Sequence, residues 1–263
     1  MDKLTIDFDK IKEIADRGVR RTAAFMGLGI NAARDIEFKK YQLSNISMIQ
    51  VLPADLDEKG ITHIKEEFEK WVISNGLREL VESFGLFLDK IHRACLLMAT
   101  HKKQMNSDDA EKFGPAFEWT GVEDKLSTLR NRFGITSEKE KYFSGINQAR
   151  NCITHRKGKV GPEDLQGEKT FQLIWWGLDL YVETPSGENH SLMPPMQEKG
   201  VFLKEGGSVN IKIKDRIVEY NLGEILNLSP NDLGEICFLV HLTTVDIVKS
   251  ALAYSKKIGI NEN

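Results

Sequence analysis

The chain has 263 residues, of which 41% are hydrophobic and 29% are charged, as in an ordinary soluble globular protein. Its net charge of −3 excludes a nucleic-acid-binding polycation, so any contact with RNA or DNA must be local. The three cysteines lie far apart and form neither a CxxC pair nor a metal-ligand cluster, which favours a reduced, cytoplasmic setting without a metal site. No apolar run reaches the ~18 residues of a membrane span, and the first residues lack the apolar run of a signal peptide.

The first 57 residues form an N-terminal helical extension. Residues 9–24 have a helical pattern of apolar positions. Gly27 and Gly29 could indicate a phosphate loop, but no strand precedes them and the third glycine is missing, so we expect a turn or helix break there. Residues 41–52 are expected to form a strand or a short helix that ends before Pro53.

Residues 58–105 carry the longest helical pattern, with apolar residues at steps of mainly three or four. Gly76 and Gly85 are expected to bend or interrupt it. The polar residues on this segment are interpreted as a solvated face; they are Glu79, Glu82, Asp89, His92 and Arg93.

Residues 106–121 are expected to be a polar loop that Trp119 anchors to the core. Residues 122–133 have the pattern of a second helix, closed by Gly134. Ser137 and Glu140 have the spacing of a capping box, which predicts a third helix running to about Arg156, with Gly158 as its stop.

Residues 168–221 are rich in aromatic and β-branched residues and predict a small antiparallel sheet. Asp215 and Arg216 are expected to form a turn between two short strands. Trp175 and Trp176 are adjacent on a strand, so one ring should face the core and the other should face outwards, where it could stack on a base. Residues 221–228 are expected to form a short helical turn, and Ser229-Pro230 should begin a final helix that ends at about residue 257.

The expected fold is therefore mainly α: a helical bundle with a small antiparallel β-sheet inserted before the last helix. The N-terminal extension covers residues 1–57, the bundle covers residues 58–160 and 229–258, and the sheet insertion covers residues 161–228. Sequential helices interrupted once by strands suit one embellished domain better than two independent domains.

One motif carries recognisable chemistry. Arg150-Asn151-Cys152-Ile153-Thr154-His155 ends the third predicted helix, and the basic residues Arg156, Lys157 and Lys159 follow it. An arginine can stabilise charge on a phosphodiester, and a histidine can move a proton near neutral pH, without any metal. The alternative is a polar helix C-terminus, where basic residues are favoured by the helix dipole. Cys152 is interpreted as a packing residue.

With this motif the chain resembles the HEPN superfamily (higher eukaryote and prokaryote nucleotide-binding domains) over roughly residues 60–160 and 229–257. The resemblance implies a metal-independent endoribonuclease without a cofactor, of a kind typical of toxins and antiviral-defence effectors. It implies that His155 transfers protons, that Arg150 stabilises the transition state and that Asn151 orients His155. It also implies a homodimer that brings two motifs together.

Arg156, Lys157 and Lys159 would then bind RNA beside this site, or form an ordinary basic helix end. An antitoxin or an activating protein is a further expected partner. The alternative functions are a non-catalytic module of the same fold that binds RNA, a nucleotide or a protein, and a regulatory subunit.

Overall fold

The computed structural model describes residues 4–39, 41, 56–165, 167–192, 202 and 204–260. It is mainly α-helical with a small antiparallel sheet before the last helix, so the expected fold class is confirmed. The elements, in chain order, are α1 (Phe8–Arg34), α2 (Glu58–His101), α3 (Ser107–Glu118), α4 (Val122–Phe133), a 3₁₀ turn (Glu140–Tyr142), α5 (Phe143–Arg156), a second 3₁₀ turn (Pro162–Asp164), β1 (Phe171–Glu183), β2 (Asn189–Ser191), β3 (Ser208–Tyr220) and α6 (Pro230–Lys257).

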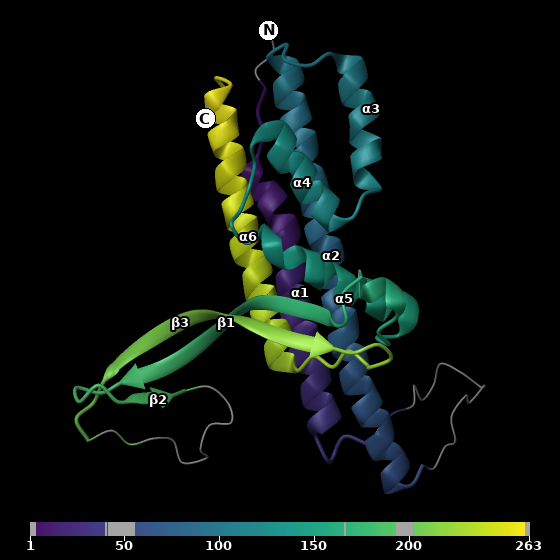
Figure 1. Cartoon of the computed structure of the whole chain (residues 1–263), viewed down its shortest axis with the longest axis vertical. Helices are drawn as coiled ribbons and strands as arrows, with labels where there is room; N and C mark the ends of the chain where they lie inside the picture. The colour runs from purple at the N-terminus through teal and green to yellow at the C-terminus, as the bar shows by residue number, and fades with distance from the viewer. Residues whose placement is uncertain are drawn as a thin grey trace.

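Helices α1, α2 and α6 form the long spine of the molecule (Figure 1). They are amphipathic enough to bury a continuous stripe against one another. Helix α1 runs antiparallel to α2, and its apolar residues Phe8, Ala15 and Ile30 belong to the same core as α2 and α6. The N-terminal helix is thus packed within the bundle.

The expected break at Gly27 and Gly29 is wrong, because α1 continues through both residues to Arg34. Gly29 lies against α2: a Cβ atom there would meet the Val72 side chain at 2.7 Å. Gly27 faces open space. The second glycine therefore allows close helix packing, and the motif is neither a phosphate loop nor a turn. The strand or helix expected at residues 41–52 lies outside the described residues, except for Tyr41.

Helix α2 is confirmed, but Gly76 and Gly85 do not interrupt it. Two of its polar residues were expected on a solvated face but are largely buried. Asp89 pairs with Lys125 of α4 at 2.7 Å, and both side chains are largely buried. His92 is buried and stacks on Phe117 of α3 with ring centroids 3.8 Å apart.

The polar loop expected at residues 106–121 is wrong, because most of it forms α3. Asn106 caps this helix by accepting a hydrogen bond from the Asp109 amide, and Pro115 is accommodated inside it. Trp119 follows the helix and is 91% exposed, so it does not anchor the segment. Helix α4 is confirmed at the expected residues, with Gly134 in the left-handed region that closes it.

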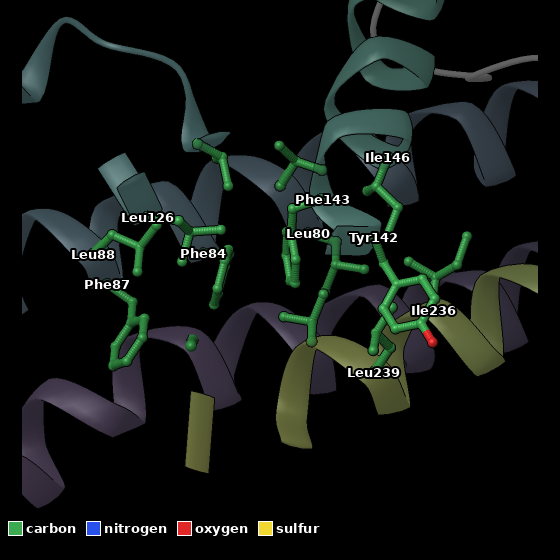
Figure 2. Packing of buried hydrophobic residues seen from close by; sticks show 14 of the residues in the cluster. Leu80, Phe84, Phe87, Leu88, Leu126, Tyr142, Phe143, Ile146, Ile236 and Leu239 are labelled. Atoms are coloured by element: carbon green, nitrogen blue, oxygen red, sulfur yellow. The ribbon is translucent and has the colours of Figure 1, made fainter. Parts of the chain in front are cut away.

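The third predicted helix begins later than expected. The Ser137 amide donates to the Glu140 carboxylate at 3.0 Å, but a 3₁₀ turn follows and the α-helix begins at Phe143. Phe143 stacks on Phe84 of α2, with ring centroids 4.5 Å apart. Figure 2 shows this junction, where the residues at the start of α5 meet residues of α2 and α6 in the core. This packing fixes the position of the motif-bearing helix α5 on the spine.

The sheet has the strand order β2-β1-β3 and lies across the spine (Figure 1). The turn expected at Asp215 and Arg216 is wrong, because β3 pairs with β1 without interruption from Tyr220 to Ser208. Arg216 is held in the strand by Glu235 of α6, which also accepts hydrogen bonds from Trp175 Nε1 at 2.9 Å and the Leu178 amide at 3.1 Å. Trp175 is therefore buried, as one of the two adjacent tryptophans was expected to be.

The helical turn expected at residues 221–228 is wrong: the segment forms a turn and then pairs with the chain after α5, through Lys159 and Ile225. Helix α6 is confirmed, and Ser229 and Asp232 form a capping box at its start. By length and composition alone α6 is apolar enough to cross a membrane, and half of its most apolar window is buried in the bundle.

Candidate functional site

Helix α5 ends at Arg156, directly after the motif, and a left-handed cap follows it. Lys157 has φ 53° and Gly158 has φ 82°, and the Gly158 amide donates to the Cys152 carbonyl at 3.2 Å. This arrangement satisfies a carbonyl group at the helix end. A lysine in the left-handed region is uncommon, since its Cβ atom is crowded there. At this helix end Thr154, His155, Lys157 and Lys159 are exposed, whereas Cys152 and Gly158 are buried.

Arg150 lies between α5 and α2 and is partly buried. Its Nη1 donates to Asn151 Oδ1 at 2.9 Å, and its Nη2 lies 3.8 Å from a carboxylate oxygen of Glu82. Its Nε is buried without a hydrogen-bond partner among the described residues. The guanidinium is thus hydrogen-bonded within α5, and only a loose ion pair with a half-exposed carboxylate joins it to α2, which adds little stability. Glu82 is the residue of this environment that the sequence pattern did not identify as part of a site.

His155 is exposed at the end of α5. In the part of the chain that the structure describes, its ring makes no hydrogen bond or ion pair, so both nitrogens are accessible to a substrate. Among the described residues Asn151 makes no hydrogen bond to His155, which it was expected to orient; its Oδ1 accepts from Arg150 Nη1. Arg150 and His155 are about 140° apart on an ideal helix, and they do not contact each other here.

Arg156 has its charge satisfied within the fold. Its Nε donates to Asp164 Oδ2 at 3.0 Å, its Nη2 donates to the other oxygen of the same carboxylate, and its Nη1 lies 2.9 Å from Glu163. The Asp164 side chain is fully buried and also accepts from the Gly161 amide at 2.8 Å. This bidentate pair ties the end of α5 to the following 3₁₀ turn, which favours a structural role for Arg156.

Lys157 and Lys159 differ from Arg156. Both are exposed, and neither has an ion pair or side-chain hydrogen bond with any described residue. Two of the three basic residues expected to bind RNA therefore offer unpaired ammonium groups.

Cys152 is fully buried and belongs to the hydrophobic core. Burial, with the nearby Asp164 charge as a second cause, raises the pKa of the Cys152 thiol to about 11. A thiol with this pKa is almost wholly protonated at neutral pH, so it is a poor nucleophile. This agrees with its interpretation as a packing residue.

Among the described residues, no group of three or more His, Cys, Asp and Glu side chains is arranged to hold a metal ion. The site as it stands offers one exposed imidazole, one partly buried guanidinium and two free ammonium groups around one helix end. These groups suit an anionic ligand: an imidazole can transfer a proton, and a guanidinium can stabilise negative charge on a phosphate ester. Comparison of the chain with protein-family models, curated proteins and solved structures found no match.

Proposed function

We propose that this protein is a metal-independent endoribonuclease of the HEPN type, acting in the cytoplasm as a toxin or an antiviral-defence effector. The observation that carries the proposal is the placement of His155. It is exposed and unpaired among the described residues, at the end of a helix whose preceding turn holds Arg150. An imidazole in this state is accessible to a substrate, and it lies in the same segment as the Arg150 guanidinium.

The reaction that fits these groups is attack of a ribose 2′-oxygen on the adjacent phosphorus. His155 removes the proton of the 2′-hydroxyl or donates a proton to the leaving 5′-oxygen. The guanidinium of Arg150 stabilises the extra negative charge on the phosphorane. The products are a 2′,3′-cyclic phosphate and a 5′-hydroxyl end, and no oxidant, reductant or metal is required.

A homodimer would complete this site. One imidazole cannot be the base and the acid of the same turnover at once, and Arg150 and His155 do not meet within one chain. A second copy supplies a second imidazole and guanidinium across a two-fold axis. Leu86 follows Glu82 by one turn on α2 and is 57% exposed, so the proposed interface would cover an apolar side chain there.

The test is cleavage of total RNA and of a tRNA pool by the purified protein in excess EDTA. The proposal predicts cleavage that is lost in His155→Ala and in Arg150→Ala. His63→Ala is the matched control, because His63 is an exposed histidine near the start of α2, away from the motif, and should cleave like the wild type. Equal cleavage by His155→Ala and the wild type would refute the site.

The second candidate is a non-catalytic RNA-binding module. It is favoured by the hydrogen bond and the ion pair that engage Arg150, and by the separation of Arg150 from His155 within one chain. RNA binding without cleavage, in the wild type and in His155→Ala alike, would support this candidate against the enzyme. An antitoxin or activator that binds the same face would be a partner of either form.

A further inference from the structure

A surface groove of about 870 Å³ lies beside the motif, between α2, the end of α5 and residues 225–228. Its α2 wall includes Trp71, Ser74, Asn75 and Arg78, and its α5 wall includes Thr154 and Lys157. The groove is therefore formed by residues far apart in the sequence and reaches the helix end that carries the motif.

The floor of this groove is fixed by backbone pairing. The Leu226 amide donates to the Gly158 carbonyl at 2.8 Å, and the Val160 amide donates to the Glu224 carbonyl at 2.8 Å. These bonds hold residues 225–228 against the chain that leaves α5. The groove is thus preformed in the protein, and a ligand need not order it, which lowers the entropic cost of binding.

Trp71 is the first feature of the groove that points to a ligand. Its side chain is 61% exposed, although tryptophan is highly buried on average. The Phe68 ring stacks beside it with centroids 6.2 Å apart and helps to hold it in place. An exposed aromatic ring held on a helix is a platform on which a nucleobase stacks, whatever the identity of the base.

The charges in the groove are the second feature. Lys70 is paired with Glu67 at 3.0 Å. Arg78 and Lys157 have no ion pair or side-chain hydrogen bond with any residue described here, and both are exposed. Arg78 follows Trp71 by seven residues, which puts both on the same face of α2, roughly 10 Å apart along its axis. An aromatic platform and a free cation on one face suit a base and a backbone phosphate.

The groove also continues to the motif. Arg78 precedes Glu82 by one helical turn, and Glu82 is the carboxylate that lies 3.8 Å from Arg150. On the other wall, Thr154 and Lys157 follow Arg150 by one and two turns of α5. A strand that crosses the groove would therefore reach the phosphate-binding groups of the motif.

We propose that this groove is a binding subsite for single-stranded RNA, in which Trp71 stacks a base and Arg78 and Lys157 bind the neighbouring phosphates. The subsite rests on the proposed function for its link to cleavage, but the binding itself does not require an active site. Because stacking and charge are its means of recognition, it accepts single strands of varied sequence.

The test is the fluorescence anisotropy of a labelled, 2′-O-methylated single-stranded RNA of about ten nucleotides, which binds but cannot undergo 2′-hydroxyl attack. Trp71→Ala should weaken binding roughly tenfold, since stacking on one aromatic ring contributes about 1–3 kcal/mol per base. Arg78→Gln should weaken it as well and reduce the salt dependence by about 0.7 in log–log slope, as expected for one lost phosphate contact. Trp119→Ala is the matched control, because Trp119 is exposed and does not line the groove.

Binding by Trp71→Ala within twofold of the wild type, with its circular dichroism unchanged, would overturn the subsite. The same loss in Trp119→Ala would also overturn it, since the effect would not belong to the groove. The two proposals fail separately. If binding depends on Trp71 but natural RNA is not cleaved, the subsite is supported and the ribonuclease is refuted. If cleavage depends on His155 but binding does not depend on Trp71, the ribonuclease is supported and the subsite is refuted.

Discussion

Replacing Lys157 by glycine should stabilise the protein and weaken its binding of RNA, two effects of opposite sign from one change. The backbone of Lys157 has φ 53°, and the left-handed region costs an L-residue roughly 1–2 kcal/mol. Glycine adopts it freely, but loses about 0.5–1 kcal/mol more chain entropy on folding. The free energy of unfolding should therefore rise by about 0.5 kcal/mol, because the exposed lysine side chain makes no hydrogen bond or ion pair with the described residues that would be lost.

Binding should change in the other direction, since the ammonium group of Lys157 lies in the groove beside the motif. The single-stranded RNA affinity should fall and its log–log salt slope should decrease by about 0.7. Urea denaturation measures the first effect and anisotropy at several salt concentrations measures the second. Lys157→Gln is the control, because it removes the charge and keeps the strained backbone. It should bind RNA as weakly as Lys157→Gly does, without the gain in stability. A less stable glycine variant, or one that binds RNA like the wild type, would refute this reasoning.

Three further predictions concern the fold. Gly27→Ala should stabilise α1 by about 1 kcal/mol through helix propensity, whereas Gly29→Ala should destabilise the protein by about 1–3 kcal/mol, because its new Cβ atom would collide with Val72 of α2. Thermal denaturation of the two variants measures the difference, and equal changes in melting temperature would count against close packing at Gly29. Burial alone would raise the pKa of Glu235, but hydrogen bonds from Arg216 and Trp175 lower it, so the wild type should lose stability as the pH falls below about 4.5. Glu235→Gln should be less stable by about 2 kcal/mol at pH 7 but should lose less on acidification. Urea denaturation at pH 7 and below about pH 4.5 measures this, and an equal loss of unfolding free energy in the two proteins would contradict it. Burial, with Arg132 and Lys125 as further causes, lowers the pKa of His92 to about 4. The free energy of unfolding should therefore drop by roughly 3 kcal/mol between pH 7 and 4, and His92→Phe should lack this drop. A drop of the same size in His92→Phe would assign the pH dependence to another group.

Helices with local end signals could be predicted from the sequence. Gly134 after α4 and the Ser229 capping box before α6 gave the right boundaries, because a cap depends only on neighbouring residues. Helix α3 was missed because Pro115 and its polar residues resemble a loop. Gly29 was misread because its close approach to α2 is a tertiary contact.

The same limit applies to the strands. Asp215 and Arg216 have turn composition, but the side chain of Arg216 is bound by Glu235, which lies on another element nineteen residues later. This pairing keeps the two residues in a continuous strand. Trp175 also depends on Glu235, so its burial could be expected only as one of two alternatives.

The candidate site could be predicted in part. The motif and its helix end are local, and both lie where the sequence indicated. The partners are not local: Glu82 beside Arg150 and Asp164 beneath Arg156 come from other segments, and spacing along α5 carries no signal for them. For the same reason nothing in the sequence indicated that Arg156 is paired with Glu163 and Asp164, or that Trp71 lines a groove beside the motif.

The measurement that tests the central proposal most directly is the chemistry of the RNA ends. A defined single-stranded RNA would be incubated with the protein in EDTA, beside the same RNA carrying one 2′-deoxy nucleotide at the cleavage position, and beside His155→Ala. The account predicts 2′,3′-cyclic phosphate and 5′-hydroxyl ends, with no cleavage at the deoxy position and none by the variant. Cleavage at the deoxy position, or 5′-phosphate ends, would contradict attack by the 2′-hydroxyl and with it the role assigned to His155.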